Sequence, residues 1–134
     1  MRPFITREAV LSSRIEGTQA TIGEILAADA GAPIKQNPDD LQEVQNYIKA
    51  LYYGLKRLNE LPLSLRLIKE IHDNLMQGVR GSHATPGEFR RSQNWIGSPG
   101  CTLNTAKFVP PPPEYLMDCL GELKKFLHNR TLPL

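Results

Sequence analysis

The chain has 134 residues, 40% of them hydrophobic, and is therefore long enough for one domain with a core. Its net charge of +2 is too small, and its basic pairs too scattered, to predict a nucleic-acid surface. The apolar runs are too short to cross a membrane, and the cysteines, Cys101 and Cys119, lack the C-x-x-C spacing of a redox or zinc site. With no secretory signal, these features favour a cytoplasmic protein with reduced thiols.

The N-terminal part predicts two short helices, at residues 7–16 and about 22–30. Gly17 and Gly31 follow them at the positions where a left-handed cap residue ends a helix. Thr21 and Glu24 have the spacing of a capping box, which indicates the start of the second helix. The residues expected to face inward in this helix are Ile22, Ile25, Leu26 and Ala30.

Two longer helices follow. Asn37 and Pro38, with acidic residues directly after them, predict a helix start. The apolar residues then repeat at helical spacing as Leu41, Val44, Ile48, Leu51, Leu55 and Leu58. Beyond Pro62, Ser64 is the predicted N-cap of a helix that runs to about Gln77, and Gly78 caps its end. The apolar face of that helix is predicted to be Leu65, Ile68, Ile71 and Leu75.

Residues 78–111 lose helical periodicity, and a loop of this length in a compact domain is usually functional. A small β-hairpin is predicted, with 93–97 paired against roughly 103–108, before a proline run at 110–113. A last helix starts at Pro113 with the stripe Leu116, Leu120, Leu123 and Leu127. The predicted fold class is all-α, with about five helices and one small β-hairpin. Residues 130–134 read as a turn and an apolar start, so another helix is expected to follow.

The chain shows no catalytic constellation. It has no phosphate-binding glycine loop, no nucleophile elbow and no cluster of metal ligands. His72 falls near an apolar helix face, which favours a structural role. Trp95 has two interpretations: a stacking platform for a base, or a residue packed on its own hairpin. The residues by themselves therefore predict no catalytic residue and no metal site.

The segment SSRIEGT, residues 12–18, is unusual because a glutamate meets an abrupt helix end. Ser12 and Glu16 are four residues apart and share one helix face, so the hydroxyl could orient the carboxylate. A glutamate at a helix C-terminus opposes the helix dipole and favours a cation as partner. Arg14 is two residues away and cannot face Glu16. Alone, the pattern is equally compatible with a surface residue at a helix end.

Three stretches together resemble the Fic-domain proteins that carry an N-terminal inhibitory helix. They are REAVLSSRIEGTQAT (7–21), TPGEFRRSQNWIG (85–97) and NTAKFVPPPPEYL (104–116). The first is similar to the family's Ser/Thr-x-x-x-Glu-Gly/Asn inhibitory motif, and the other two are similar to the segments around its β-hairpin flap. The resemblance implies an inhibitory-helix segment at 1–31. It also implies the N-terminal part of a Fic-like helical domain at 32–134, with a flap at about 85–109.

The activity implied by the resemblance is transfer of AMP from ATP, with Mg²⁺, to a hydroxyl side chain of a target protein. Glu16 would be the inhibitory glutamate, which pairs with a catalytic arginine that otherwise holds the ATP γ-phosphate. Ser12 would orient Glu16, and Gly17 would end the helix. The flap residues would bind the target by main-chain β-pairing; they are Gln93, Asn94, Trp95, Ile96 and Gly97.

The family's catalytic signature, His-Pro-Phe-x-x-Gly-Asn-Gly-Arg-x-x-Arg, is absent from the sequence. In the family it lies downstream of the last helix predicted here. The chain therefore resembles a truncated protein, the regulatory and target-binding half, and is predicted to be inactive and to bind neither ATP nor Mg²⁺ alone. Its expected partners are a target protein, the missing catalytic half or a separate Fic core, and further copies of itself through uncovered apolar stripes.

Two other interpretations remain. The chain could be a freestanding inhibitory module, similar to the family's antitoxin partners, acting on a separate Fic core. The flap argues against it, because an inhibitor needs only the helix. Alternatively, helix 64–77 could be the recognition helix of a small nucleic-acid-binding domain, but it offers only Arg66 and Lys69 before the acidic Glu70.

Overall fold

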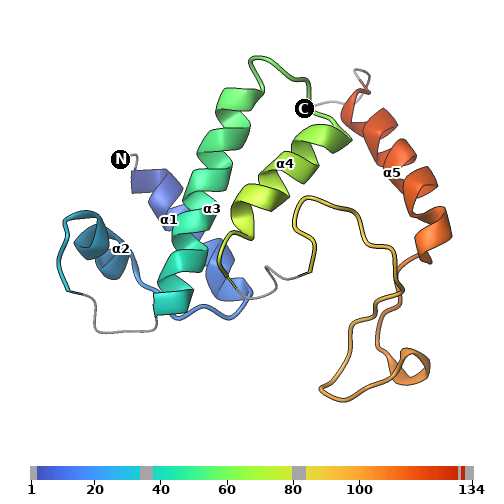
Figure 1. Ribbon diagram of the computed structural model, residues 1–134, viewed down its shortest axis with the longest axis horizontal. Helices are drawn as coiled ribbons and strands as arrows, with labels where there is room; N and C mark the ends of the chain where they lie inside the picture. Colours follow the sequence, from blue (N-terminus) through green and yellow to red (C-terminus); the bar gives the residue numbers. More distant parts are fainter. Residues whose placement is uncertain (1–2, 34–37, 80–83, 130, 132–134) are drawn as a thin grey trace. The chain divides into compact units, whose positions relative to one another are not determined.

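The computed structural model describes residues 3–33, 38–79, 84–129 and 131. Within them the chain forms five α-helices, α1 (Pro3–Ile15), α2 (Ile22–Asp29), α3 (Pro38–Arg57), α4 (Leu65–Leu75) and α5 (Pro113–Leu127), and one 3₁₀ turn, η1 (Leu103–Thr105) (Figure 1). The all-α prediction is confirmed. The chain divides into two compact units, Met1–Glu88 and Phe89–Leu134.

In the first unit α3 packs against α4, α1 and α2 (Figure 1). The core lies where α1 and α2 meet the first half of α3, and consists of Ala9, Val10, Ala20, Ile25, Leu41, Val44 and Ile48. The predicted α3 stripe is therefore buried only as far as Ile48. Leu55 and Leu58 are 50% and 45% exposed, because the cluster that α1 and α2 complete does not extend to them.

The helix starts agree with the local sequence except at α1. The Thr21 hydroxyl accepts the Glu24 N–H at 3.3 Å while the Glu24 carboxylate accepts the Thr21 N–H at 2.8 Å, so the capping box is confirmed. The Ser64 hydroxyl accepts the Leu67 N–H at 3.3 Å, as expected of an N-cap. α1 begins at Pro3 rather than at residue 7; proline is favoured at the first helical position, and the additional turn includes the buried Thr6. Asn37, the predicted N-cap of α3, lies outside the described residues. Residues 130 and 132–134 at the end of the chain also lie outside them.

α4 contacts α3 closely. A Cβ at Gly54 of α3 would lie 2.8 Å from Cδ1 of Ile71, so the absence of a side chain at Gly54 permits this approach. The predicted apolar face of α4 is only half correct. Leu67, which lies outside the predicted stripe, is the fully buried residue of this helix, whereas Ile68, Ile71 and Leu75 are partly exposed.

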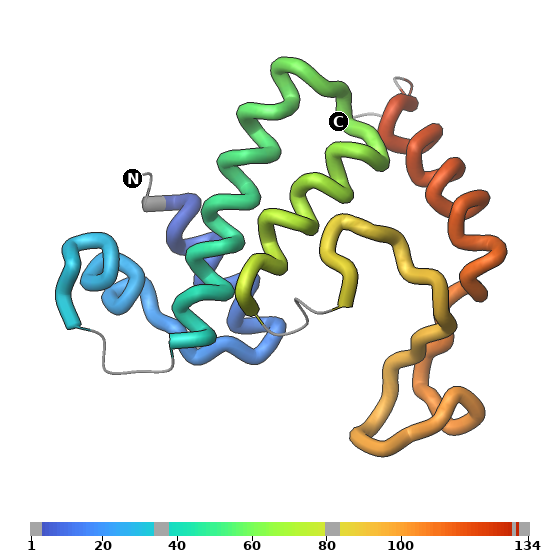
Figure 2. Tube along the Cα trace, viewed as in Figure 1, coloured from blue at the N-terminus to red at the C-terminus, as the bar shows by residue number. Residues whose placement is uncertain are grey.

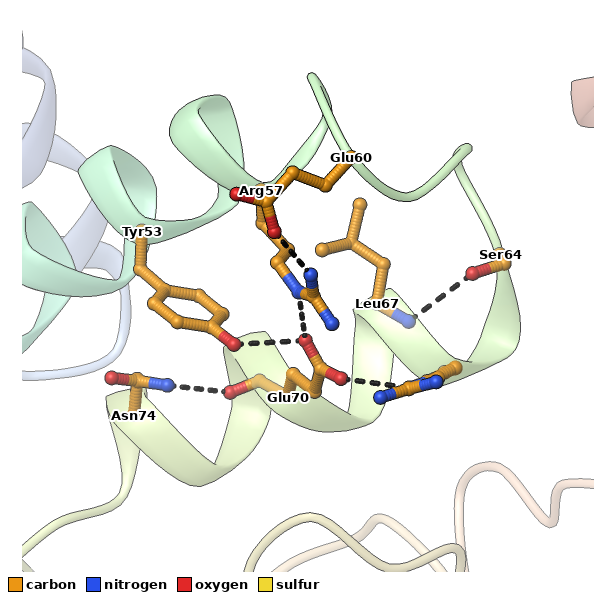
Figure 3. A network of polar contacts seen from close by, with 8 residues as sticks. Tyr53, Arg57, Glu60, Ser64, Leu67, Glu70 and Asn74 are labelled. Carbon is orange, nitrogen blue, oxygen red and sulfur yellow. Dashed lines mark hydrogen bonds and ion pairs between the residues drawn. The ribbon is translucent and has the colours of Figure 1, made fainter.

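A polar network also joins α3 to α4 (Figure 3). The Glu70 carboxylate accepts hydrogen bonds from the Tyr53 hydroxyl at 2.8 Å, from Arg57 Nε at 2.9 Å and from Arg66 Nε at 2.9 Å. Arg57 also pairs with Glu60 at 2.6 Å. The hydrogen bonds from Arg57, Tyr53 and Arg66, in that order of effect, lower the pKa of Glu70 from 4.5 to about 2.

The second unit begins with a loop of two arms that precede α5 (Figure 2). Ile96 and Phe108 form one antiparallel bridge, with the Ile96 N–H donating to Phe108 at 2.8 Å and the Phe108 N–H donating to Ile96 at 3.0 Å. The predicted hairpin is not supported: no strand forms among the described residues of this unit, and part of the expected second strand is η1.

The proline run explains why the pairing stops. Proline has no N–H, so residues 110–113 cannot continue a ladder of main-chain hydrogen bonds. Side chains bind their carbonyls instead. The Gln93 amide donates to Pro110 O at 3.1 Å, and the Arg90 guanidinium donates to Pro111 O.

α5 starts at Pro113, as predicted, and carries no buried residue. Of its predicted stripe, Leu116 and Leu120 are partly buried, while Leu123 and Leu127 are 40% and 37% exposed. Among the helices described, none has the length and apolar character needed to cross a membrane.

Candidate functional site

The C-terminus of α1 is a Schellman turn. The Thr18 N–H donates to Ser13 O at 3.2 Å, and the Gly17 N–H donates to Arg14 O at 3.1 Å. Gly17 has φ +99°, the left-handed conformation that this motif requires and that glycine adopts at least cost. Glu16 is therefore the C-cap residue of α1. The prediction that Gly17 ends the helix is confirmed.

Glu16 is exposed and lines a groove of about 570 Å³ in the first unit. Within the described part of the chain its carboxylate has no hydrogen-bond or ion-pair partner. α1, α3 and the end of α4 with the turn after it form the walls of this groove, which we call the Glu16 groove. The lining residues are Ser12, Ser13, Glu16, Glu43, Tyr47, Leu75, Met76 and Val79.

Ser12 is close to Glu16 in this groove but does not bind it. The Ser12 hydroxyl donates to the Glu8 carboxylate at 2.8 Å, one turn earlier in α1. The hydrogen bond expected between Ser12 and Glu16 is therefore not formed. The reason is that α1 ends at Ile15, so Glu16 leaves the helical path on which the i, i+4 spacing was based, whereas Glu8 stays on it.

Asn46 fixes the far wall of the Glu16 groove. This residue of α3 is 2% exposed, and its amide donates to Leu75 O at 3.0 Å and to Gln77 O at 2.7 Å. It thereby satisfies carbonyls at the end of α4 that have no helical partner. The Gln42 side-chain amide donates to Oδ1 of Asn46 at 2.7 Å and holds the Asn46 amide in this orientation.

The sequence did not single out Glu43, Tyr47 or Asn46. Glu43 and Tyr47 are four residues apart on α3, beside the apolar stripe, which is a signal for a shared helix face but not for a groove. Only the packing of α4 and α1 against that face places them beside Glu16. Glu43 adds a second carboxylate to the groove, so among the described residues the lining contains two acidic side chains and no basic one.

The predicted flap residues lie in the second unit and form an extended arm. Gln93 donates to Asn94 O at 2.9 Å as well as to Pro110 O. The Trp95 indole N–H donates to Cys101 O at 3.1 Å, so Trp95 is hydrogen-bonded to its own loop, and its side chain is 41% exposed. A Cβ at Gly97 would lie 2.5 Å from Cys101 Sγ, so a larger residue there would require the Cys101 side chain to move.

The arm exposes both apolar side chains and main chain. Ile96 is 64% exposed and Phe108 across from it 56%. Ile96 directs its own N–H and C=O toward Phe108. Because main-chain groups alternate in direction along an extended segment, those of Trp95 and Gly97 point to the opposite edge.

In the described ranges no group of three or more His, Cys, Asp or Glu residues is arranged to hold a metal ion. His72 accepts the Gly87 N–H on Nδ1 at 3.0 Å, which agrees with the structural role expected for it. Cys101 and Cys119 are free thiols.

Comparison with known proteins finds a similarity in the N-terminal part of the chain. Residues 1–56, which contain α1, α2 and nearly all of α3, match the family described as "Fic/DOC family N-terminal". Over these residues the chain is similar to the N-terminal part of Fic family proteins. A Fic family protein from Desulfovibrio desulfuricans, known from a crystal structure, is similar with a TM-score of 0.67 and 18% sequence identity.

That similarity covers 98% of this chain and 37% of the bacterial protein, so this chain spans little more than a third of the length of that protein. At this identity the similarity concerns the fold. A comparison with curated protein sequences gave no match.

Proposed function

We propose that this chain is the regulatory and target-binding N-terminal portion of a Fic-type protein adenylyltransferase, with Glu16 as its inhibitory carboxylate. The observation that carries the proposal is the position of Glu16 next to a Schellman turn, at the edge of a groove that Glu43 also lines. Glu16 is exposed, and its carboxylate has no partner among the residues that the structure describes. The intact enzyme would transfer AMP from ATP, with Mg²⁺, to a hydroxyl side chain of a target protein. This chain contributes no catalytic residue to that reaction.

The electrostatics of the Glu16 groove favour a guanidinium. Glu16 lies at the negative end of the α1 dipole, and Glu43 lines the same groove, so a cation there is attracted by two carboxylates and a helix end. A carboxylate also binds a guanidinium in a two-pronged, charge-assisted geometry. An arginine of a Fic core that is held by Glu16 is not available to the ATP γ-phosphate, and the fixed negative charge repels that phosphate. AMP transfer is therefore blocked.

The target-binding role rests on the extended arm at 93–97. Its outer edge offers the main-chain groups of Trp95 and Gly97, and a peptide segment can pair with such an edge as an added strand. The exposed Ile96 and Phe108 supply apolar contact beside that edge. The bridge between Ile96 and Phe108 and the hydrogen bond from the Gln93 amide to Pro110 O stabilise the extended conformation of the arm. Binding of a target strand therefore does not require a longer hairpin.

The test measures incorporation of label from ATP with Mg²⁺ into protein. The samples are this chain alone, a protein in which this chain precedes a Fic core, and that protein with Glu16→Gln or Glu16→Gly. We expect strong labelling only with the Glu16 variants, by about tenfold or more over the unchanged protein. The matched control is Asp29→Asn, which removes an exposed acid at the end of α2 and is expected to leave labelling low.

Equal labelling with and without Glu16 would contradict the inhibitory role. A further sample mixes this chain with a separately produced Fic core. Full inhibition of that core, lost on Glu16→Gln, would favour the freestanding inhibitory module over a portion of the enzyme.

A further inference from the structure

A second groove, with a volume of about 430 Å³, is lined by residues of α1 and by Leu51 of α3. Its lining is mainly apolar, with one basic and one acidic residue in the middle. We call this surface the α1 groove; it consists of Phe4, Ile5, Arg7, Glu8, Leu11 and Leu51. Phe4 is 82% exposed and Leu11 46% exposed, so large apolar side chains face water on this surface.

The α1 groove is arranged symmetrically along the helix. Phe4 and Leu11 are seven residues apart, which is close to two helical turns and roughly 10 Å, so they lie on one face. Arg7 and Glu8 occupy the turn between them. Phe4 and Leu11 are therefore equally far from the midpoint between Arg7 and Glu8.

This symmetry makes the surface complementary to itself. If a second copy lies antiparallel across α1 on a two-fold axis at that midpoint, Phe4 of each copy meets Leu11 of the other. Arg7 of each copy then meets Glu8 of the other, which gives two ion pairs from one patch. An interface related by a two-fold axis requires a patch of this kind, in which the same residues supply both halves.

Glu8 and Arg7 are both available for ion pairs with a second copy. The Glu8 carboxylate is oriented by the Ser12 hydroxyl at 2.8 Å, which leaves acceptor capacity for a guanidinium. Arg7 is exposed and has no carboxylate partner within the described residues. The patch carries one charge of each sign, so a second copy is attracted in the antiparallel orientation, whereas a parallel one would place like charges together.

We propose that this protein forms a two-fold dimer through the α1 groove, with two antiparallel α1 helices in contact. The proposal does not depend on the role of Glu16, since the Glu16 groove and the α1 groove have no lining residue in common. One helix pair buries less surface than a standard protein interface, so the dimer is expected to dissociate at roughly micromolar concentration.

The test is sedimentation velocity of the full chain across a concentration series. The variants are Arg7→Glu, Glu8→Arg and the double charge swap. Each single variant puts two like-charge contacts in the interface and is expected to weaken dimerisation by about tenfold or more. The double swap restores opposite charges across the axis and is expected to return the dissociation constant to within about threefold of the original.

Lys49→Glu is the matched control, because it reverses an exposed charge on the face of α3 opposite Leu51. It is expected to leave the dissociation constant unchanged. Circular dichroism of each variant checks that α1 still folds. A monomer at every concentration would overturn the proposal, and so would a dimer that the single variants do not weaken or the double swap does not restore.

Discussion

Gly17 determines where α1 ends and where Glu16 lies. Its φ of +99° is a left-handed conformation that costs an L-residue with a Cβ about 1–2 kcal/mol, although nothing lies within 4 Å of where that Cβ would be. The cost would therefore come from the backbone and not from a steric contact. α1 carries Ala9 and Val10 into the core, so a strained end at Gly17 affects the whole first unit.

We expect Gly17→Ala to lower the free energy of unfolding by about 1 kcal/mol, measured by urea denaturation. Gly17→Asn should lose less, because asparagine tolerates this conformation better. Gly23→Ala is the control. Gly23 lies in α2 without a positive φ, and its nearest neighbour would be Thr21 Oγ1 at 3.9 Å, so stability should be unchanged or higher. An unchanged stability for Gly17→Ala would contradict the Schellman assignment.

The sequence correctly predicts that Glu16 lies at a helix end, but the predicted hydrogen bond between Ser12 and Glu16 is not formed. The glycine after Glu16 was sufficient to predict a helix end, because the left-handed cap is a local requirement. The partner of Ser12 was not predictable from spacing, since Glu8 and Glu16 are both four residues away and the choice depends on the last helical residue. α1 ends at Ile15, and the hydroxyl binds Glu8.

At the scale of elements, α3 and α4 are joined by a charged network and by close packing at Gly54. Glu70 accepts from two arginines and a tyrosine at 2.8–2.9 Å (Figure 3). The folded pKa of Glu70, about 2, is below its ordinary value of 4.5. Folding therefore favours the charged form, and the resulting stability is present above about pH 4.5 and is lost as the pH falls toward 2.

We expect the free energy of unfolding, measured by urea denaturation across this pH range, to fall as the pH is lowered from 4.5 to 2. Glu70→Gln should lose most of that pH dependence, because its side chain does not titrate. Tyr53→Phe removes one donor and should move the loss toward higher pH. An unchanged pH profile for Glu70→Gln would show that other carboxylates cause the acid sensitivity.

The loop at 89–112 shows where an element cannot be predicted from β-propensity. The run at 93–97 suggested a strand, but the partner arm leads into prolines that cannot donate main-chain hydrogen bonds. The chain compensates with Arg90 and Gln93, which bind Pro111 and Pro110 through their side chains. The result is a single bridge rather than a hairpin.

At the scale of the whole molecule, burial is distributed unevenly between the two units. The α3 segment from Leu41 to Ile48 is part of the core, whereas α5 has no buried residue. Local opening of a helix is easier where few apolar contacts resist it. The two units are therefore expected to differ in stability.

Amide hydrogen exchange of the full chain should show this difference. We expect the amides of α5 to exchange at least about tenfold faster than those of residues 41–48, because opening α5 exposes little apolar surface. The two helices have main-chain hydrogen bonds of the same kind, so residues 41–48 serve as the internal control. Equal protection of α5 would mean that its apolar face is covered in solution, for instance by a second copy.

The sequence was sufficient to predict the five helices and most of their ends, since caps, prolines and apolar periodicity act within a few residues. It also placed Glu16 and Gly17 at a helix end. The packing of α1, α3 and α4 decided the rest. It assembled the Glu16 groove with Glu43 and Tyr47, directed Ser12 to Glu8 and buried Leu67 rather than its neighbours. These outcomes depend on contacts between residues distant in the chain, which local patterns do not encode.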